Sequence, residues 1–147
     1  MGLVSCCDIV VAAEHSTFGL SEVRLGIVPA VISPFVLAKV GMSNGRQIFL
    51  TGERFDANQA KSFGLVHHVV TEEELDTKVT ERVKQLLQAA PGAQASAKTL
   101  IKHVASQQNP ESLREYTATL IARRRASDEG KEGMSSFLEK RKPNWQA

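Results

Sequence analysis

The chain has 147 residues, of which 42% are hydrophobic and 23% are charged, and its formal net charge is +2. This length and composition suit a globular protein with a buried core and exclude a disordered or fibrous one. The one dense cluster of positive charges, Arg123–Arg125, is followed by acidic residues and indicates a solvated helix face rather than an anion site. No apolar run reaches the roughly 18 residues of a membrane span, so we expect neither a nucleic acid nor a membrane as a partner.

The two cysteines, Cys6 and Cys7, are adjacent in an apolar segment. A neighbouring pair makes a poor structural disulfide, and the chain has no other thiol. We expect both to pack as small apolar side chains in a reducing compartment, either the cytoplasm or, in a eukaryote, the mitochondrial matrix.

The first part of the chain, residues 1–70, alternates short apolar segments with turn residues. Glycines and side-chain caps set the expected boundaries of these elements. The pattern predicts a buried strand over 6–13, a strand over 17–20, a helix over 35–40 ended by Gly41, a helix from Asn44 to Gly52, a helix over 57–63 capped by Asp56 and ended by Gly64, and a strand over 65–70.

The remaining residues, 71–147, have the apolar spacing of helices. Thr71 and Glu74 form a capping-box pattern, and Pro91 and Pro110 each precede a further helical segment. Gly130 and Gly133 are expected to interrupt the chain before a last helix over 134–141. Short strands followed by helices predict an α/β layer with a helical extension.

Glu22 is the carboxylate best placed for chemistry, because it lies in a loop between two apolar segments. Burial there would raise the pKa of its carboxyl group, which suits a general acid or base. The alternative is a surface ion pair with Arg24 or Lys39. The four histidines have no i, i+4 pair on one helix, so we expect no metal site.

Three segments of the sequence resemble the crotonase superfamily, the enoyl-CoA hydratase/isomerase proteins. These are residues 6–14 (CCDIVVAAE), 18–29 (FGLSEVRLGIVP) and 131–143 (KEGMSSFLEKRKP). The resemblance implies an α/β fold, with the carboxyl-terminal part of a crotonase β-β-α spiral over residues 1–70 and a helical oligomerisation region over 71–147. It also implies an N-terminally truncated form and a homo-oligomer, either a trimer or a dimer of trimers.

The resemblance assigns the catalytic acid/base role to Glu22, which transfers the proton at the α-carbon of the thioester. The matching active-site loop residues are Gly2, Gly19, Pro29 and Ala30. The second glutamate of the family's hydratases falls six residues before Asp8, where this chain has Gly2. This departure from the two-glutamate pattern leaves open an isomerase with one glutamate.

The carboxyl-terminal segment resembles the one that approaches the adenine and phosphate end of CoA bound to a neighbouring subunit. Phe137 and Lys140 match those positions. The alternative is that Phe137 packs in the hydrophobic core and that Lys140 is a solvated surface lysine. The implied function is hydration of an α,β-unsaturated acyl-CoA. Among the family's hydratases, residues 21–34 most resemble those of the enzymes that act on branched glutaconyl-type thioesters of leucine and isoprenoid breakdown. No metal or redox cofactor is implied. A different class of answer is an inactive fragment that only assembles with crotonase-fold partners.

Overall fold

The computed structural model describes residues 1–146, and the chain divides into two compact units, Met1–Glu81 and Arg82–Ala147. The boundary falls inside one helix, α4 (Leu75–Leu87). Within the described residues, no helix is long and apolar enough to span a bilayer.

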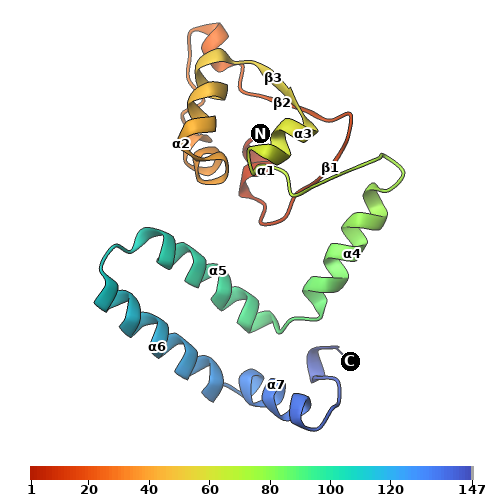
Figure 1. Cartoon of the computed structure of the whole chain (residues 1–147), viewed down its shortest axis with the longest axis vertical. Helices are drawn as coiled ribbons and strands as arrows, with labels where there is room; N and C mark the ends of the chain where they lie inside the picture. The colour runs from red at the N-terminus through yellow and green to blue at the C-terminus, as the bar shows by residue number, and fades with distance from the viewer. Residues whose placement is uncertain (147) are drawn as a thin grey trace. The chain divides into compact units, whose positions relative to one another are not determined.

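The first unit combines helices, the longest of which is α2, with four three-residue strands; Figure 1 labels three of these strands. Its elements before α4 are α1 (Gly2–Cys6), β1 (Val11–Ala13), β2 (Thr17–Gly19), the 3-10 turn η1 (Glu22–Leu25), α2 (Ser33–Thr51), β3 (Arg54–Asp56), α3 (Ala57–Ser62) and β4 (His68–Val70).

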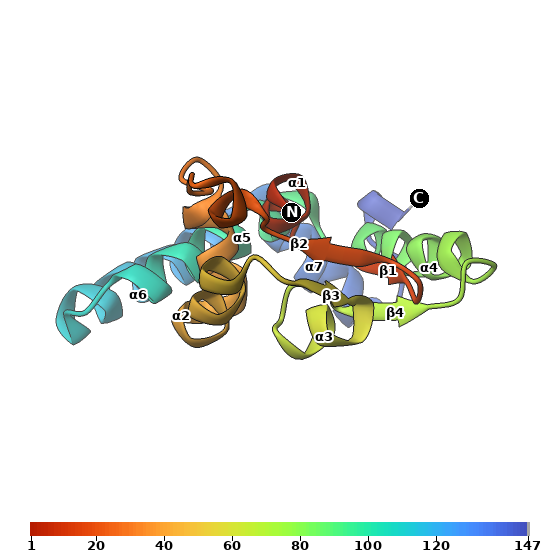
Figure 2. The same cartoon turned by 90° about the horizontal axis from the view of Figure 1, so that it is seen from above.

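The four strands form two separate pairs. β1 pairs in parallel with β4, with Ala12 opposite Val69. β2 pairs antiparallel with β3, with Phe18 opposite Phe55. Figure 2 shows α3 running beneath β3 and β4. Because β4 is distant in sequence from β1, this pairing depends on the packing of α2 and α3 between them rather than on a local turn.

The hydrophobic core lies in the first unit and includes Val36 and Ile48 of α2, both fully buried. Phe55 anchors the antiparallel pair, since its ring stacks on Phe18 at 5.9 Å and meets Phe63 edge-on at 5.4 Å. The other buried apolar side chains of this cluster are Val10, Ala12, Leu20, Val40, Ala57, Ala60, Leu65 and Val66.

Several sequence-predicted boundaries of the first unit are confirmed. Asp56 caps α3 through a complete capping box with Gln59, and Gly52 and Gly64 have positive φ values of 61° and 82° where helices end. Gly41 breaks α2 with a φ of 72° and a ψ of 170°. Asn44, however, does not cap a new helix, because its side-chain amide donates to Val40 O instead.

The predicted strand over 6–13 is wrong in its first part. Residues Gly2–Cys6 form α1, which packs against α2, and only Val11–Ala13 pair as a strand. Cys6 and Cys7 are both exposed rather than packed, because they lie where α1 ends and the chain turns. The strand β3 was not expected from the sequence, since its apolar content is a single phenylalanine.

The second unit is helical. It holds the end of α4, then α5 (Pro91–Ser106), α6 (Pro110–Ala126), α7 (Asp128–Leu138) and the 3-10 turn η2 (Asn144–Gln146). α5 and α6 lie side by side, and α7 contacts both of them (Figure 1). His103 of α5 stacks on Tyr116 of α6 at 3.8 Å.

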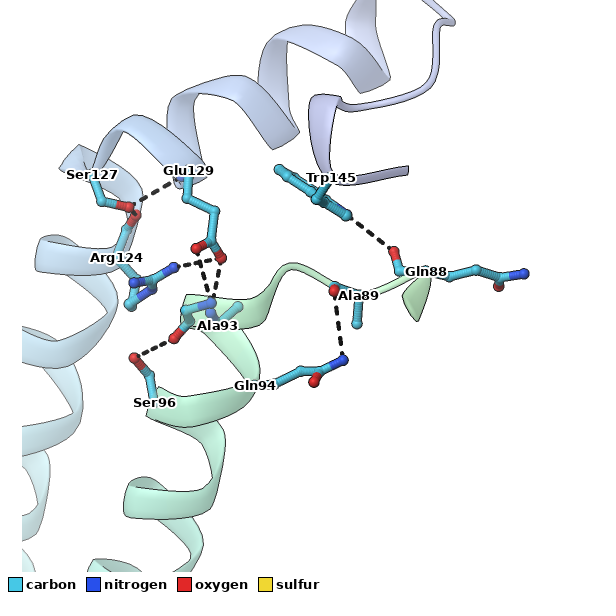
Figure 3. A network of polar contacts seen from close by, with 11 residues as sticks. Gln88, Ala89, Ala93, Gln94, Ser96, Arg124, Ser127, Glu129 and Trp145 are labelled. Atoms are coloured by element: carbon cyan, nitrogen blue, oxygen red, sulfur yellow. Dashed lines mark hydrogen bonds and ion pairs between the residues drawn. The ribbon is translucent and has the colours of Figure 1, made fainter. Parts of the chain in front are cut away.

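Glu129 holds this helical unit together (Figure 3). Its two carboxylate oxygens accept the backbone N–H groups of Gly92 and Ala93, both at 2.9 Å, at the beginning of α5. Arg124 donates to the same carboxylate at 2.9 Å. α5 therefore receives its N-terminal cap from α7 rather than from Ala90, which precedes it.

The predicted break at Gly130 and Gly133 is wrong, because both glycines lie inside α7. Each allows a close approach instead of loosening the chain. A Cβ at Gly130 would overlap Arg124 O, and a Cβ at Gly133 would lie 3.1 Å from the ring of Trp145. The indole is fixed from the other side by its N–H bond to Gln88 O at 3.2 Å.

Candidate active site

Glu22 opens a short 3-10 turn that follows directly on β2. The turn closes at Gly26, whose φ of 74° places its N–H on Glu22 O and Val23 O. Arg24 fastens the turn to the end of α2, since its Nε donates to Thr51 O at 3.1 Å. The backbone that carries Glu22 is thus held by β2 before it and by the hydrogen bond of Arg24 to α2 after it.

Glu22 is half-buried as a residue, and its carboxyl group forms no hydrogen bond or ion pair with any residue in 1–146. The two cations considered as ion-pair partners are occupied elsewhere, Arg24 on Thr51 O and Lys39 on Asp8 O at 3.4 Å. The surface ion pair is therefore not formed, and the carboxyl group remains available to a ligand.

The loop after Glu22 places Pro29 in the interior and Ala30 at the surface. Ala30 O accepts both the backbone N–H and the hydroxyl group of Ser33, which fixes the start of α2. Ile32, which directly precedes Ser33, packs against Gly2, where a Cβ would lie 2.7 Å from the Cγ2 of Ile32. A glutamate at position 2 would have to displace Ile32, so the glycine fits the packing.

A hollow of about 250 Å³ lies beside the segment that leads into Glu22. Gly19 and Ser21, the residues that lead into Glu22, line it together with Met1 and Arg54. Met1, which precedes Gly2, and Ser21, which precedes Glu22, thus line the same hollow. Glu22 itself is not among the lining residues.

Phe137 and Lys140 lie in the second unit, at the end of α7. Phe137 is 82% exposed, so it does not plug the core of its own unit. Lys140 is exposed as well and has a φ of 54°, the left-handed conformation that glycine usually takes after a helix. Both side chains are available for a ligand or a further protein surface.

Arg141 binds two carboxylates directly beside Lys140. Its guanidinium donates to Glu132 at 2.6 and 2.9 Å and to Glu139 at 2.6 Å. The hydrogen bonds from Arg141 and from the backbone N–H of Asn144 lower the pKa of Glu132 to about 2. Hydrogen bonds from Ser135 and Arg141 also lower the pKa of Glu139.

Sequence reasoning missed this carboxylate–arginine network and the role of Arg54 in the hollow. Both depend on contacts between segments that the sequence pattern does not connect, and the charged run 139–142 looks like an ordinary solvated helix end. Across the described part of the chain, no group of three or more His, Cys, Asp or Glu side chains is arranged to hold a metal ion.

Comparison with known proteins gives a consistent match along the whole chain. The enoyl-CoA hydratase/isomerase family matches residues 1–147. A curated relative, the mevalonyl-coenzyme A hydratase of Aspergillus fumigatus, is 32% identical over 97% of this chain and 54% of its own length. A probable mitochondrial enoyl-CoA hydratase of Dictyostelium discoideum is 31% identical over 97% of this chain and 52% of its own length.

Solved structures of other proteins have the same fold. A putative enoyl-CoA hydratase/isomerase (crotonase) of Legionella pneumophila is 42% identical, with a TM-score of 0.91 over 98% of this chain and 56% of that one. The AtuE protein of Pseudomonas aeruginosa is 37% identical, with a TM-score of 0.93 over 99% of this chain and 57% of that one. The chain spans about half the length of the curated relatives that it matches.

Proposed function

This chain belongs to the enoyl-CoA hydratase/isomerase family and has a crotonase-type fold, and we propose that it takes part in the hydration of an α,β-unsaturated acyl-CoA, with Glu22 as the acid/base. We propose a reaction without a metal or redox cofactor: the addition of water changes no net oxidation state, so it requires no redox cofactor, and Glu22 is the proposed proton donor. Acyl-CoA is the substrate.

In the proposed step, the oxygen of a water molecule bonds to the β-carbon of the enoyl thioester while the α-carbon takes a proton from the carboxyl group of Glu22. The water gives up one proton, which restores the carboxyl group. Negative charge develops on the thioester oxygen during this step, and backbone N–H groups are the usual way to stabilise it. Gly2 matches the loop that supplies one of those groups in the family.

The observation that carries the proposal is the state of Glu22. The residue is half-buried, the turn that carries it is fastened by Arg24, and the cations Arg24 and Lys39 bind backbone oxygens rather than the carboxylate. A structural glutamate at this position would be expected to pair with one of them. An unpaired carboxyl group on a fixed turn suits proton transfer.

The test measures the absorbance of a conjugated enoyl thioester on addition of the chain and of Glu22→Gln. Glutamine keeps the shape but cannot transfer the proton, so we expect the rate to fall by about two to four orders of magnitude. Glu14→Gln, a change at an exposed glutamate of the same unit, is the matched control and should retain the wild-type rate. Equal rates for Glu22→Gln and the wild type would contradict the proposal.

Gly2 favours a second candidate, isomerisation of the enoyl double bond with Glu22 as the single acid/base. Isomerisation leaves the mass of the product unchanged, whereas hydration adds one water, so mass spectrometry of the product separates the two reactions. If neither product forms, a role as an inactive subunit that assembles with crotonase-fold partners is favoured instead.

We also propose a branched, glutaconyl-type acyl group and a trimer or a dimer of trimers. Ala30, Val31 and Ile32 form a bulky apolar stretch after Pro29, which suits a branched acyl chain. Large apolar side chains of the second unit remain open to solvent, as a subunit interface would require, among them Ile101 at 70% and Leu138 at 78% exposed. Light scattering on the purified chain tests the assembly.

A further inference from the structure

The helical unit contains a second hollow, of about 300 Å³, which we call the Trp145 hollow. Its walls come from the start of α5, the end of α6, the α7 helix and Trp145, and Figure 3 shows four of the residues that line it, Ala93, Arg124, Glu129 and Trp145. Its apolar lining consists of Ala90, Ala93, Gly130, Gly133, Met134 and Trp145. A hollow of this size with a mostly apolar lining lies at the lower end of the range for small-molecule sites.

Trp145 forms a fixed apolar wall of the Trp145 hollow. Its indole N–H donates to Gln88 O at 3.2 Å, so the one polar atom of the ring is already bonded. A Cβ at Gly133 would lie only 3.1 Å from the ring, so the indole sits directly against the backbone of α7. Met134, whose flexible thioether adapts to irregular shapes, lines the same hollow. The indole and this side chain are thus suited to contact an apolar ligand.

The two arginines that line the Trp145 hollow differ in their partners. Arg124 donates to Glu129 at 2.9 Å, and this carboxylate also accepts two backbone N–H groups of α5, so the pair carries no net charge. Arg125, by contrast, forms no hydrogen bond or ion pair with any residue in 1–146. Asp128, the next acidic residue along the chain, does not pair with it. An apolar lining is therefore combined with one uncompensated positive charge.

We infer that the Trp145 hollow binds an amphipathic carboxylate, such as a medium-chain fatty acid, with its apolar chain against Trp145 and its carboxylate paired with Arg125. A guanidinium can donate two parallel hydrogen bonds to a carboxylate, which fixes the head group. A neutral apolar ligand would leave this charge unused, and a cationic ligand would be repelled by it. All residues of the site lie in the second unit and Glu22 is not among them, so the inference does not depend on the proposed function.

The experiment titrates the full chain with octanoate, below the concentration at which octanoate forms micelles. The signal is the fluorescence of Trp145, the sole tryptophan. Octanoate bound in the hollow displaces water from the indole, so we expect saturable binding with a shift of the emission to the blue. Absence of a saturable shift would overturn the inference.

Paired variants test the role of the charge. Arg125→Gln should weaken the binding of octanoate about fivefold, the upper end of what an exposed ion pair contributes, and should leave the Kd of uncharged octanol unchanged. Arg123→Gln, at an exposed arginine of the same helix that does not line the hollow, is the matched control and should bind octanoate as the wild type does. An unchanged Kd of octanoate in Arg125→Gln, or an equal loss in Arg123→Gln, would overturn the inference.

A filled hollow tests the role of the apolar lining. Ala93→Leu adds a larger side chain at the start of α5 but keeps the backbone N–H that Glu129 accepts, so it should weaken octanoate and octanol alike. Circular dichroism on the same samples shows whether the helical unit is still folded. Arg125→Gln removes no hydrogen bond or ion pair, so it tests the inference even if Ala93→Leu fails to fold. Wild-type affinity for octanoate in a folded Ala93→Leu chain would overturn the inference.

Discussion

Replacement of Glu129 by alanine should destabilise the helical unit strongly. The carboxylate accepts two backbone N–H groups of α5 and one donor of Arg124, each at 2.9 Å, with the Arg124 and Glu129 side chains only 27% and 23% exposed. Loss of a helix cap costs about 0.5–2 kcal/mol, and hydrogen bonds to a charged group contribute about 1.5–3 kcal/mol. Allowing for partial exposure, we expect a loss of about 2–4 kcal/mol.

Thermal unfolding followed by circular dichroism is the assay, and the expected fall in Tm is about 10 °C or more for a unit of this size. Amide hydrogen exchange gives a local readout, because the N–H groups of Gly92 and Ala93 should lose protection. Glu115→Ala, at an exposed position of α6, is the matched control. A Tm within about 2 °C of the wild type, with both amides still protected, would refute the reasoning.

Two further predictions concern one residue in each unit. Gly133→Ala adds a Cβ 3.1 Å from the ring of Trp145. This contact should offset the gain of about 1 kcal/mol in helix propensity, and the fluorescence emission of Trp145, the sole tryptophan, should shift to the red. A higher Tm with unchanged fluorescence would contradict this prediction. Burial, with Lys39 and His68 nearby, lowers the pKa of His67 from 6.5, and the neutral Nδ1 accepts the N–H of Val10 at 3.0 Å. The contribution of His67 to the stability of the first unit should therefore be fully present above about pH 6.5 and should be lost as the pH falls below that value. Urea unfolding at several pH values checks this, and the decline should be smaller in His67→Asn; an equal decline in both proteins would count against it.

The sequence predicted the local boundaries well where one residue decides them. Asp56 caps α3 because its side chain reaches an N–H three residues away, and Thr71 with Glu74 forms the expected reciprocal bonds before α4. The positive φ at Gly52 and Gly64 likewise depends only on the missing Cβ. These features need no distant partner, which is why the pattern of residues is enough to predict them.

Predictions failed where a distant segment decides the conformation. Gly130 and Gly133 looked like helix breakers, but they lie inside α7, where the absence of a Cβ lets Arg124 and Trp145 approach closely. The strand β3 exists because Phe55 packs against Phe18 across the pair. No periodicity within 54–56 indicates that contact.

The sequence by itself determined the family, the crotonase-type fold and the position of Glu22 after a short strand, because these follow from spaced local motifs. Only the tertiary structure decided that α5 is capped by Glu129 from 36 residues away, that Glu22 is left without an ion pair, and that Arg141 occupies the carboxylates beside a strained Lys140. Each of these depends on which groups meet in space after the core has formed, and a linear pattern of residue types does not contain that information.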